Sequence, residues 1–259
     1  MPNCLSGLKY FKNSINIFNR HLPLVSSTEI NSELIKELIG KENPTILEIG
    51  CNNGAHTLWF LEIFRNPILY CFEPDPRAIS RFKINVGERS NVRLFEVALG
   101  DRNGEIDFFQ SSGQRSDEEA KQMPDGWDQS GSIRQPKEHL AVHPWVKFDR
   151  KIKVAILTLD AWIGRHGIDS IDFIWMDVQG AEIDVFRGGV DALSRTRFIY
   201  TEYSDQQLYQ GQFGLRKLLK FMDGFEVVAR YPGDVLLRNR KLIKKPKFSL
   251  RKTILKLIQ

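Results

Sequence analysis

Acidic residues stand where three successive apolar runs of the sequence end. Glu48, Glu73 and Asp101 close or follow runs that read as buried strands. The carboxyl ends of parallel strands meet at one edge of an open sheet, where ligands bind in such folds. A carboxylate at the end of a buried strand is costly unless it meets a cation or several donors. We therefore expect Glu48 to face an ammonium group, Glu73 to accept from the two hydroxyls of a ribose, and Asp101 to accept from an adenine amino group.

The turn after the first of these runs has the form Gly-x-x-x-Gly. Gly50 and Gly54 flank Asn52, and a helical pattern begins at Ala55. A strand, a tight turn and a helix N-terminus bring backbone N–H groups close to a small polar ligand. A dinucleotide fingerprint requires glycine at the position of Asn52, so that the backbone can approach a pyrophosphate. Asn52 therefore disfavours NAD or FAD, while Gly50, Asn52 and Gly54 are expected to hold a different ligand together with Glu48.

A second set of carboxylates follows two later strand candidates. Asp177 comes directly after the apolar run 173–176, Glu182 begins the next helical pattern, and Glu202 ends the run 198–202. Group transfer to a hydroxyl needs the oxygen oriented and its proton removed, so Asp177 is a candidate base. The three carboxylates could also bind Mg²⁺, which would acidify a bound hydroxyl. The alternative is that they bind only solvent or donors of the substrate.

The polar stretch 110–150 interrupts this regular pattern. It contains the histidines His139 and His143 and the tryptophans Trp127 and Trp145. A long insertion in a compact domain is either a functional lid or a disordered loop, and the aromatic content favours a lid over a ligand. An imidazole that titrates near neutral pH suits general-base work, so both histidines are further catalytic candidates. Surface exposure without a catalytic role is the alternative for each.

Strand and helix candidates alternate along the rest of the chain. The strands are expected at 45–49, 68–73, 92–98, 171–176, 198–202, 225–231 and 235–237. The helices are expected at 55–64, 76–86, 159–166, 181–186 and 213–222. This alternation predicts an α/β fold with a mostly parallel sheet. Only 232–234 join the last two strands, and a connection that short permits only an antiparallel hairpin.

The chain divides into three parts by pattern and charge. Two amphipathic helices, at 5–18 and from about 26–31 to Ile39, make 1–43 a helical cover, and 44–240 forms one domain with 110–150 as its insertion. From Arg238 onwards there are nine basic and no acidic residues, whereas the remainder has 28 basic against 32 acidic residues. The segment 241–259 is therefore a basic amphipathic tail. It suits an anionic membrane surface or RNA, or docking on its own domain.

The amino-acid composition indicates the cellular compartment. The three cysteines form no C-x-x-C pair, which favours a reducing compartment over a disulfide framework or a zinc site. No apolar run approaches the roughly 18–20 residues of a membrane span, and the N-terminus lacks the pattern of a signal peptide. We therefore expect a cytoplasmic protein of unknown oligomeric state, with contact at the membrane surface as the option that the tail adds.

Five motifs of the chain resemble, in order, those of FkbM-type S-adenosylmethionine-dependent methyltransferases. They are Glu48-Ile-Gly-Cys-Asn-Asn-Gly54, Phe72-Glu-Pro74, Val97-Ala-Leu-Gly-Asp101, Leu157-Thr-Leu-Asp160 and Asp177-Val-Gln-Gly-Ala-Glu182. The resemblance covers about residues 44–239 and implies a Rossmann-like class I methyltransferase fold with a seven-stranded sheet. It further implies that Glu48 and Gly50 face the methionine part of the donor, Glu73 the ribose and Asp101 the adenine.

The resemblance also implies an activity. It predicts an O-methyltransferase that uses S-adenosylmethionine and acts on a hydroxyl of a sugar, a glycan or a natural product. An RNA-modifying methyltransferase that uses the basic tail is one alternative. An NAD(P)-dependent oxidoreductase is another, which Asn52 and the terminal hairpin disfavour.

Overall fold

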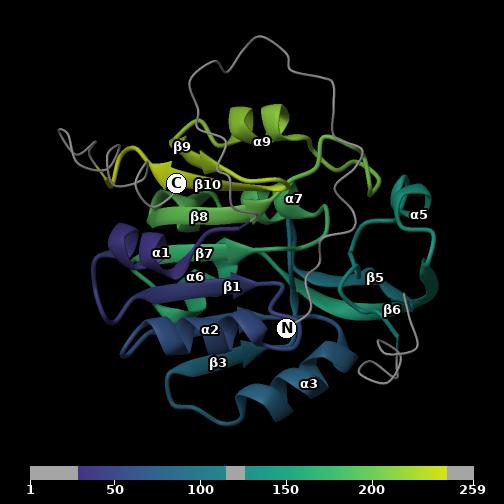
Figure 1. Ribbon diagram of the computed structural model, residues 1–259, viewed down its shortest axis with the longest axis horizontal. Coiled ribbons are helices and arrows are strands. Elements are labelled where there is room, and N and C mark those ends of the chain that lie inside the picture. Colours follow the sequence, from purple (N-terminus) through teal and green to yellow (C-terminus); the bar gives the residue numbers. More distant parts are fainter. Residues whose placement is uncertain (1–28, 115–125, 244–259) are drawn as a thin grey trace.

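The main sheet organises the molecule, shown in Figure 1 as a computed structural model that describes residues 29–114 and 126–243. Seven strands follow the order β3-β2-β1-β7-β8-β10-β9. They are β1 (Thr45–Ile49), β2 (Ile68–Phe72), β3 (Val92–Phe95), β7 (Ile171–Met176), β8 (Thr196–Glu202), β9 (Phe225–Arg230) and β10 (Asp234–Asn239). The β8–β10 and β10–β9 pairs are antiparallel and the other four pairs are parallel. The predicted mostly parallel sheet with a terminal hairpin is confirmed.

Helices cover both faces of this sheet because its strands are apolar on both sides (Figure 1). The helices on one face are α1 (Ser32–Ile39), α2 (Ala55–Ile63) and α3 (Pro76–Val86). The helices on the other face are α6 (Leu159–His166), α7 (Glu182–Arg187), α8 (Val190–Ser194) and α9 (Leu215–Phe221). Within β1, Ile46 packs under the first group, while Leu47 and Ile49 pack under the second. The sheet is thus buried, and polar ligands can reach it only at the strand ends.

Local signals set the ends of α1 as expected. Asn31 caps it, since the Leu34 backbone N–H donates to Asn31 Oδ1 at 2.9 Å. Gly40 ends it in the left-handed conformation at φ 67°. The other predicted N-terminal helix, at 5–18, lies outside the described residues, and so does the tail from 244 onwards.

A second sheet corrects the sequence-based assignment around the third strand and the insertion. The predicted strand 92–98 is divided, because β3 ends at Phe95 and β4 (Ala98–Leu99) belongs to a three-stranded sheet of order β4-β6-β5. The other two strands are β5 (Gly104–Gly113) and β6 (Val146–Leu157). Both ends of the predicted insertion 110–150 are therefore strand. Long-range pairing of β5 with β6 makes them so, and no local pattern reveals it.

Backbone hydrogen bonds attach the described middle of the insertion to other parts of the chain. Ser132 and Phe109 exchange two backbone hydrogen bonds, of 2.8 and 3.1 Å. Farther along, the Lys137 N–H donates to the Leu208 carbonyl at 2.7 Å. The short helix α5 (His139–Val142) follows this second contact. The insertion is thereby attached both to the second sheet and to the segment that follows β8.

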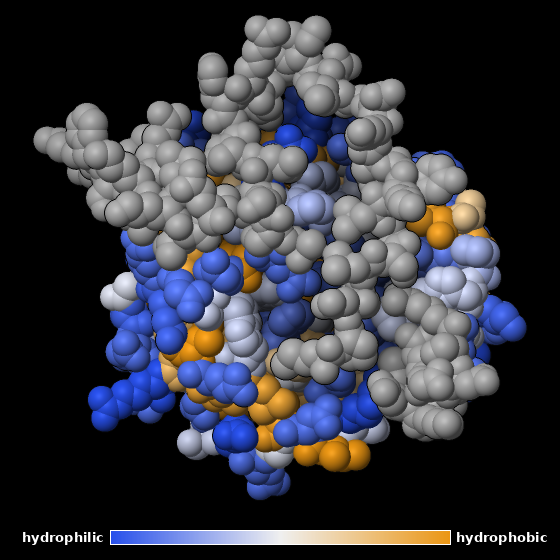
Figure 2. Space-filling view, in the orientation of Figure 1, coloured by the Kyte–Doolittle hydropathy of each residue, from blue (hydrophilic) through white to orange (hydrophobic). Residues whose placement is uncertain are grey.

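The surface of the described chain is mainly hydrophilic on the face that Figure 2 shows, where apolar side chains form separate groups. Exposed large apolar residues such as Ile84 and Val190 lie on different helices, α3 and α8. Within residues 29–114 and 126–243, no helix has the length and apolar character needed to cross a bilayer.

Candidate active site

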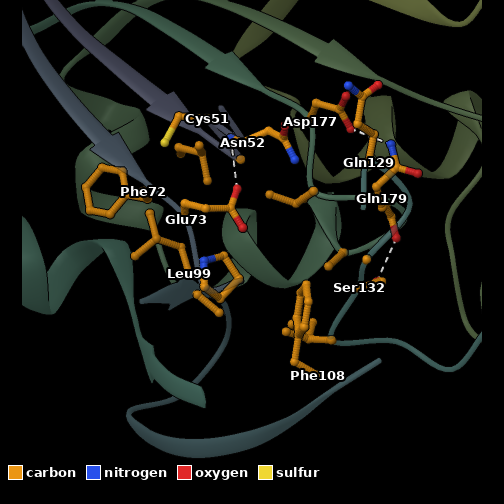
Figure 3. A pocket seen from close by; sticks show the side chains of 18 of the residues that line it. Cys51, Asn52, Phe72, Glu73, Leu99, Phe108, Gln129, Ser132, Asp177 and Gln179 are labelled. Atoms are coloured by element: carbon orange, nitrogen blue, oxygen red, sulfur yellow. Dashed lines mark hydrogen bonds between the residues drawn. The ribbon is translucent and has the colours of Figure 1, made fainter. Parts of the chain in front are cut away.

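A cavity opens at the carboxyl ends of the central strands (Figure 3). Its walls come from the turn 50–53 after β1, from 72–74 after β2, from 97–99 at β4, from the insertion segment 128–133, and from 177–179 after β7. The space inside the cavity measures about 180 Å³, and the cavity is partly open to solvent. It therefore suits a small-molecule ligand that enters at the strand ends.

Glu73 forms the polar wall on the β2 side. Its two oxygens accept one backbone hydrogen bond each, from Asn52 and from Asp75, both at 2.9 Å. Burial, helped by the charges of Asp75 and Asp128, raises the pKa of Glu73 to about 8 against the effect of these donors. Each oxygen keeps capacity for a further hydrogen bond, which suits a pair of ligand hydroxyls.

Asn52 adds an unsatisfied acceptor to the same wall. It lies in the left-handed region at φ 42°, and its Nδ2 donates to Asp128 at 3.3 Å. Its Oδ1 is buried and has no partner among the described residues. A buried acceptor without a donor is costly, so this atom suits a donor on a ligand. Together with Glu73, it fits the polar groups of S-adenosylmethionine.

The two glycines of the first turn have different roles. Gly50 has φ 85°, and a Cβ built there would lie 1.9 Å from the Asp177 carbonyl oxygen. Glycine is required at this position because the turns after β1 and β7 touch through their backbones. Gly54 has φ 82° and packs on α3, since a Cβ there would meet Val86 Cγ2 at 2.4 Å. Gly50 and Asn52 line the cavity, whereas Gly54 does not.

Glu48 lies under α2 and does not line the cavity. Its side chain accepts a hydrogen bond from the Thr57 hydroxyl, and the Cys71 thiol lies 3.8 Å from the same oxygen. Complete burial raises the pKa of Glu48 to about 8. The other carboxyl oxygen, Oε1, is buried without a partner among the described residues, and the expected contact with a ligand ammonium stays a prediction.

Asp101 is exposed and also lies off the cavity. Its nearest ionic contact is Arg102 at 3.9 Å. The neighbouring residues Val97, Ala98 and Leu99 line the cavity instead, and β4 ends at Leu99, before Asp101. An apolar surface thus stands where an adenine-binding carboxylate was expected.

The later carboxylates converge on one amide. Asp177 faces the cavity, and its Oδ1 accepts from Gln179 Nε2 at 2.6 Å. The same nitrogen donates to Glu202 Oε2 at 3.0 Å. Burial, together with the charges of Asp177 and Glu182, raises the pKa of Glu202 well above its ordinary value. Burial thus favours the protonated form of Glu202.

Glu182 accepts its hydrogen bond from a different donor. Its Oε1 accepts from the Gly180 backbone N–H at 3.1 Å, and burial raises its pKa to about 7. Among the described residues, no three histidine, cysteine or acidic side chains are arranged to hold a metal ion. The Gln179 amide nitrogen, a donor that cannot coordinate a cation, bridges the two nearest carboxylates. The predicted Mg²⁺ site of Asp177, Glu182 and Glu202 does not fit this arrangement.

The two predicted catalytic histidines lie outside the cavity. His139 is buried in α5, where its ring packs on Tyr209 at 5.3 Å and Phe148 at 5.2 Å. Burial and the neighbouring His143 lower the pKa of His139 to about 4, which makes it a weak base. His56, for which no chemical role was predicted, does line the cavity, with its ring 4.3 Å from that of Trp175.

Sequence reasoning missed several residues of the cavity. Asp128 lies in the insertion, where it accepts from Asn52 and forms an ion pair with Arg81 of α3. The insertion offers no local pattern that would single it out. Gln179, in contrast, belongs to the motif Asp177–Glu182, so its position beside Asp177 was a usable signal. Only its side-chain contacts required the structure.

Comparisons with known proteins agree with the geometry. The model of the family described as "Methyltransferase FkbM domain" matches residues 48–231. The 2-O-methyltransferase NoeI of Sinorhizobium fredii is 52% identical over 221 residues, covering 84% of this chain and 88% of that protein. Methyltransferase 1 of Beauveria bassiana is 23% identical over 193 residues, covering 72% of this chain and 74% of that protein. A putative rRNA-methylase of Clostridium thermocellum superposes with a TM-score of 0.44 at 14% identity, covering 80% of this chain and 92% of its own.

Proposed function

The chain belongs to the FkbM methyltransferase family and is an S-adenosylmethionine-dependent enzyme, and we propose that it methylates a hydroxyl group of a sugar or glycan. The observation that carries the proposal is the contact between the turns after β1 and β7. Gly50 touches the Asp177 backbone, and both residues line one cavity. This contact sets a carboxylate beside the turn at which a donor would bind. The relative with 52% identity, named a 2-O-methyltransferase, supports an oxygen acceptor.

The donor half of the site is proposed to consist of Gly50, Asn52 and Glu73. S-adenosylmethionine supplies an electrophilic methyl group on a sulfonium. The free Asn52 Oδ1 would accept from a polar hydrogen of the donor, and Glu73 would bind the ribose hydroxyls. Phe72 and Leu99 supply apolar surface suited to the adenine. Glu48, Gly54 and Asp101 have no part in this assignment, since they lie off the cavity.

The acceptor half is proposed to face Asp177. An alcohol is a poor nucleophile, and a carboxylate that takes up its proton during transfer raises its reactivity. The surrounding wall is polar, with Gln129 and Ser132 from the insertion and Gln179 from the turn after β7. Amides, a hydroxyl and a carboxylate together suit an acceptor with several hydroxyls, as a sugar has. A natural-product hydroxyl is the alternative acceptor within the same chemistry.

The match to the FkbM family and the 52% identical 2-O-methyltransferase do not favour the RNA-modifying and NAD(P)-dependent alternatives considered from the sequence. Contact of the basic tail with an anionic membrane remains part of the proposal. The charge of 241–259 supports it, although 244–259 lie outside the described residues. Co-sedimentation with anionic vesicles should fall when the chain is truncated before Lys241. Equal pelleting of both proteins would refute the membrane contact.

A transfer assay with labelled S-adenosylmethionine tests the proposed reaction. Free sugars, lipid-linked glycans and RNA would be offered to the full-length protein, and label is expected on a sugar hydroxyl. Asp177→Asn should lower kcat by about 100-fold or more, because it removes the proton acceptor. Asp169→Asn is the matched control, since Asp169 is exposed at the opposite end of β7 and should leave kcat unchanged. Label on RNA alone, or full activity of Asp177→Asn, would contradict the proposal.

A further inference from the structure

Gln179 adopts an uncommon backbone conformation at the edge of the cavity. Its φ of 51° lies in the left-handed region, which a residue with a long side chain rarely occupies. The following Gly180 has φ 89°, and a Cβ there would lie 2.8 Å from Tyr209 Cδ2. The turn is thus pressed against the Tyr209 ring. Such a conformation persists only where the surroundings hold the residue in place.

The side-chain contacts of Gln179 fix the direction of its amide. Nε2 donates its two hydrogens to two carboxyl groups, Asp177 at 2.6 Å and Glu202 at 3.0 Å. On the other side, the Tyr209 hydroxyl faces two acceptors, Gln179 Oε1 at 3.0 Å and the Ser130 carbonyl at 2.8 Å. The reverse amide orientation would bring an oxygen within 2.6 Å of the Asp177 carboxylate and would be repulsive.

The main chain of Gln179 ties the same residue to the insertion. Ser132 Oγ donates to the Gln179 carbonyl at 2.7 Å. The Tyr209 hydroxyl reaches Ser130 of the same segment. The insertion therefore holds the Gln179 backbone directly and is linked to its side chain through Tyr209 (Figure 3 shows the Ser132 contact).

The charges around Gln179 give this anchoring a chemical consequence. Burial raises the pKa of Glu202 well above its ordinary value and so disfavours a negative charge on it, whereas Asp177 is the member of the pair that faces the cavity. A flexible carboxylate on an open cavity would adopt several rotamers, only some of which reach an acceptor. The short bond from the fixed amide restricts Asp177 to one of them.

We propose that Gln179 is a positioning residue for the transfer reaction. It holds the Asp177 carboxylate toward the acceptor hydroxyl, and it makes the orientation of that carboxylate depend on the position of the segment 130–132. This role rests on the proposed function of Asp177. Gln179 itself needs no contact with the donor or the acceptor. The insertion thereby helps to order the catalytic carboxylate as well as the acceptor wall.

The test uses two variants of the full-length enzyme that act on different parts of the anchor. Gln179→Asn tolerates the left-handed backbone but shortens the amide by one methylene, so it cannot bridge both carboxylates. Tyr209→Phe keeps the ring under Gly180 and removes the hydroxyl. We expect kcat to fall about 10- to 100-fold in Gln179→Asn and by a smaller factor in Tyr209→Phe. KM for S-adenosylmethionine should stay unchanged in both.

The pH profile separates positioning from a merely structural role. Loss of a donor to the carboxylate disfavours its charged form, so the acidic limb of kcat should move to higher pH in Gln179→Asn. Gln135→Asn, an exposed amide of the insertion, should match wild type. Unchanged kcat and pH profile in Gln179→Asn, or a loss of kcat with an unmoved limb, would overturn the positioning role while Asp177→Asn still reports on the reaction. A wild type that methylates no hydroxyl would overturn both.

Discussion

Replacing Glu48 with glutamine distinguishes a buried structural acid from a ligand-binding carboxylate. Glu48 is 0% exposed, and its pKa rises from an ordinary 4.5 to about 8. Because the folded state binds this proton more tightly than the unfolded state, the contribution of Glu48 to stability is fully present below pH 4.5. It is lost as the pH rises toward 8. Glutamine carries no such proton, and its Oε1 can still accept from Thr57.

The magnitude follows from the difference between the two pKa values. Each pH unit corresponds to about 1.4 kcal/mol. We therefore expect wild type to lose about 5 kcal/mol of stability relative to Glu48→Gln between pH 4.5 and pH 8. Above pH 8 the difference should level off. Other titrating groups cancel, since both proteins share them.

Urea unfolding at half-unit steps from pH 4.5 to 9 measures this difference. Glu62→Gln, exposed on the same helix α2, is the matched control, and its difference from wild type should stay nearly constant. Calorimetric titration with S-adenosylhomocysteine should give Glu48→Gln nearly the affinity of wild type, because Glu48 lies off the cavity. Glu48 would instead be a ligand-binding carboxylate if the difference in free energy of unfolding did not change with pH and the affinity for S-adenosylhomocysteine fell by about tenfold or more.

Three further predictions concern the cavity. Gly50→Ala should lower the free energy of unfolding by about 3 kcal/mol or more, because its Cβ would overlap the Asp177 carbonyl at a left-handed φ; an unchanged urea midpoint would contradict the close turn contact. Glu73→Ala should abolish the thermal stabilisation by S-adenosylhomocysteine that wild type shows, since the paired acceptor at the cavity wall is removed; an equal shift in melting temperature would exclude Glu73 from donor binding. Treatment with EDTA should leave turnover unchanged, because a donor nitrogen bridges Asp177 and Glu202; activity that is lost and then restored by Mg²⁺ would overturn this.

Local chemistry made much of the main sheet predictable. Strands such as β1 and β7 are mainly apolar on both faces, and such runs are recognisable from residue type alone. The hairpin of β9 and β10 followed from the length of its connection, since three residues cannot carry a parallel crossover. The second sheet was not predictable in this way, because β5 and β6 gain their strand character by pairing with each other across the insertion.

The site residues also differ in how far the local sequence predicted their positions. The positions of Gly50, Asn52, Glu73 and Asp177 after predicted parallel strands placed them at one edge of the sheet, and all four line one cavity. Glu48 was expected there too, since it stands near the end of the first buried strand. It lies under α2, so its side chain contacts Thr57 instead.

What the sequence determined by itself was the family, the parallel sheet and the set of strand ends that carry polar residues, because these depend on the type and spacing of neighbouring residues. What only the tertiary structure decided was which of those polar groups face the cavity and what holds them. Asp128 enters from the insertion, His139 packs behind Tyr209, and Gln179 joins Asp177 to Glu202. The physical reason is that burial, hydrogen bonding and proton affinity depend on groups that are distant in the chain and meet only when it folds.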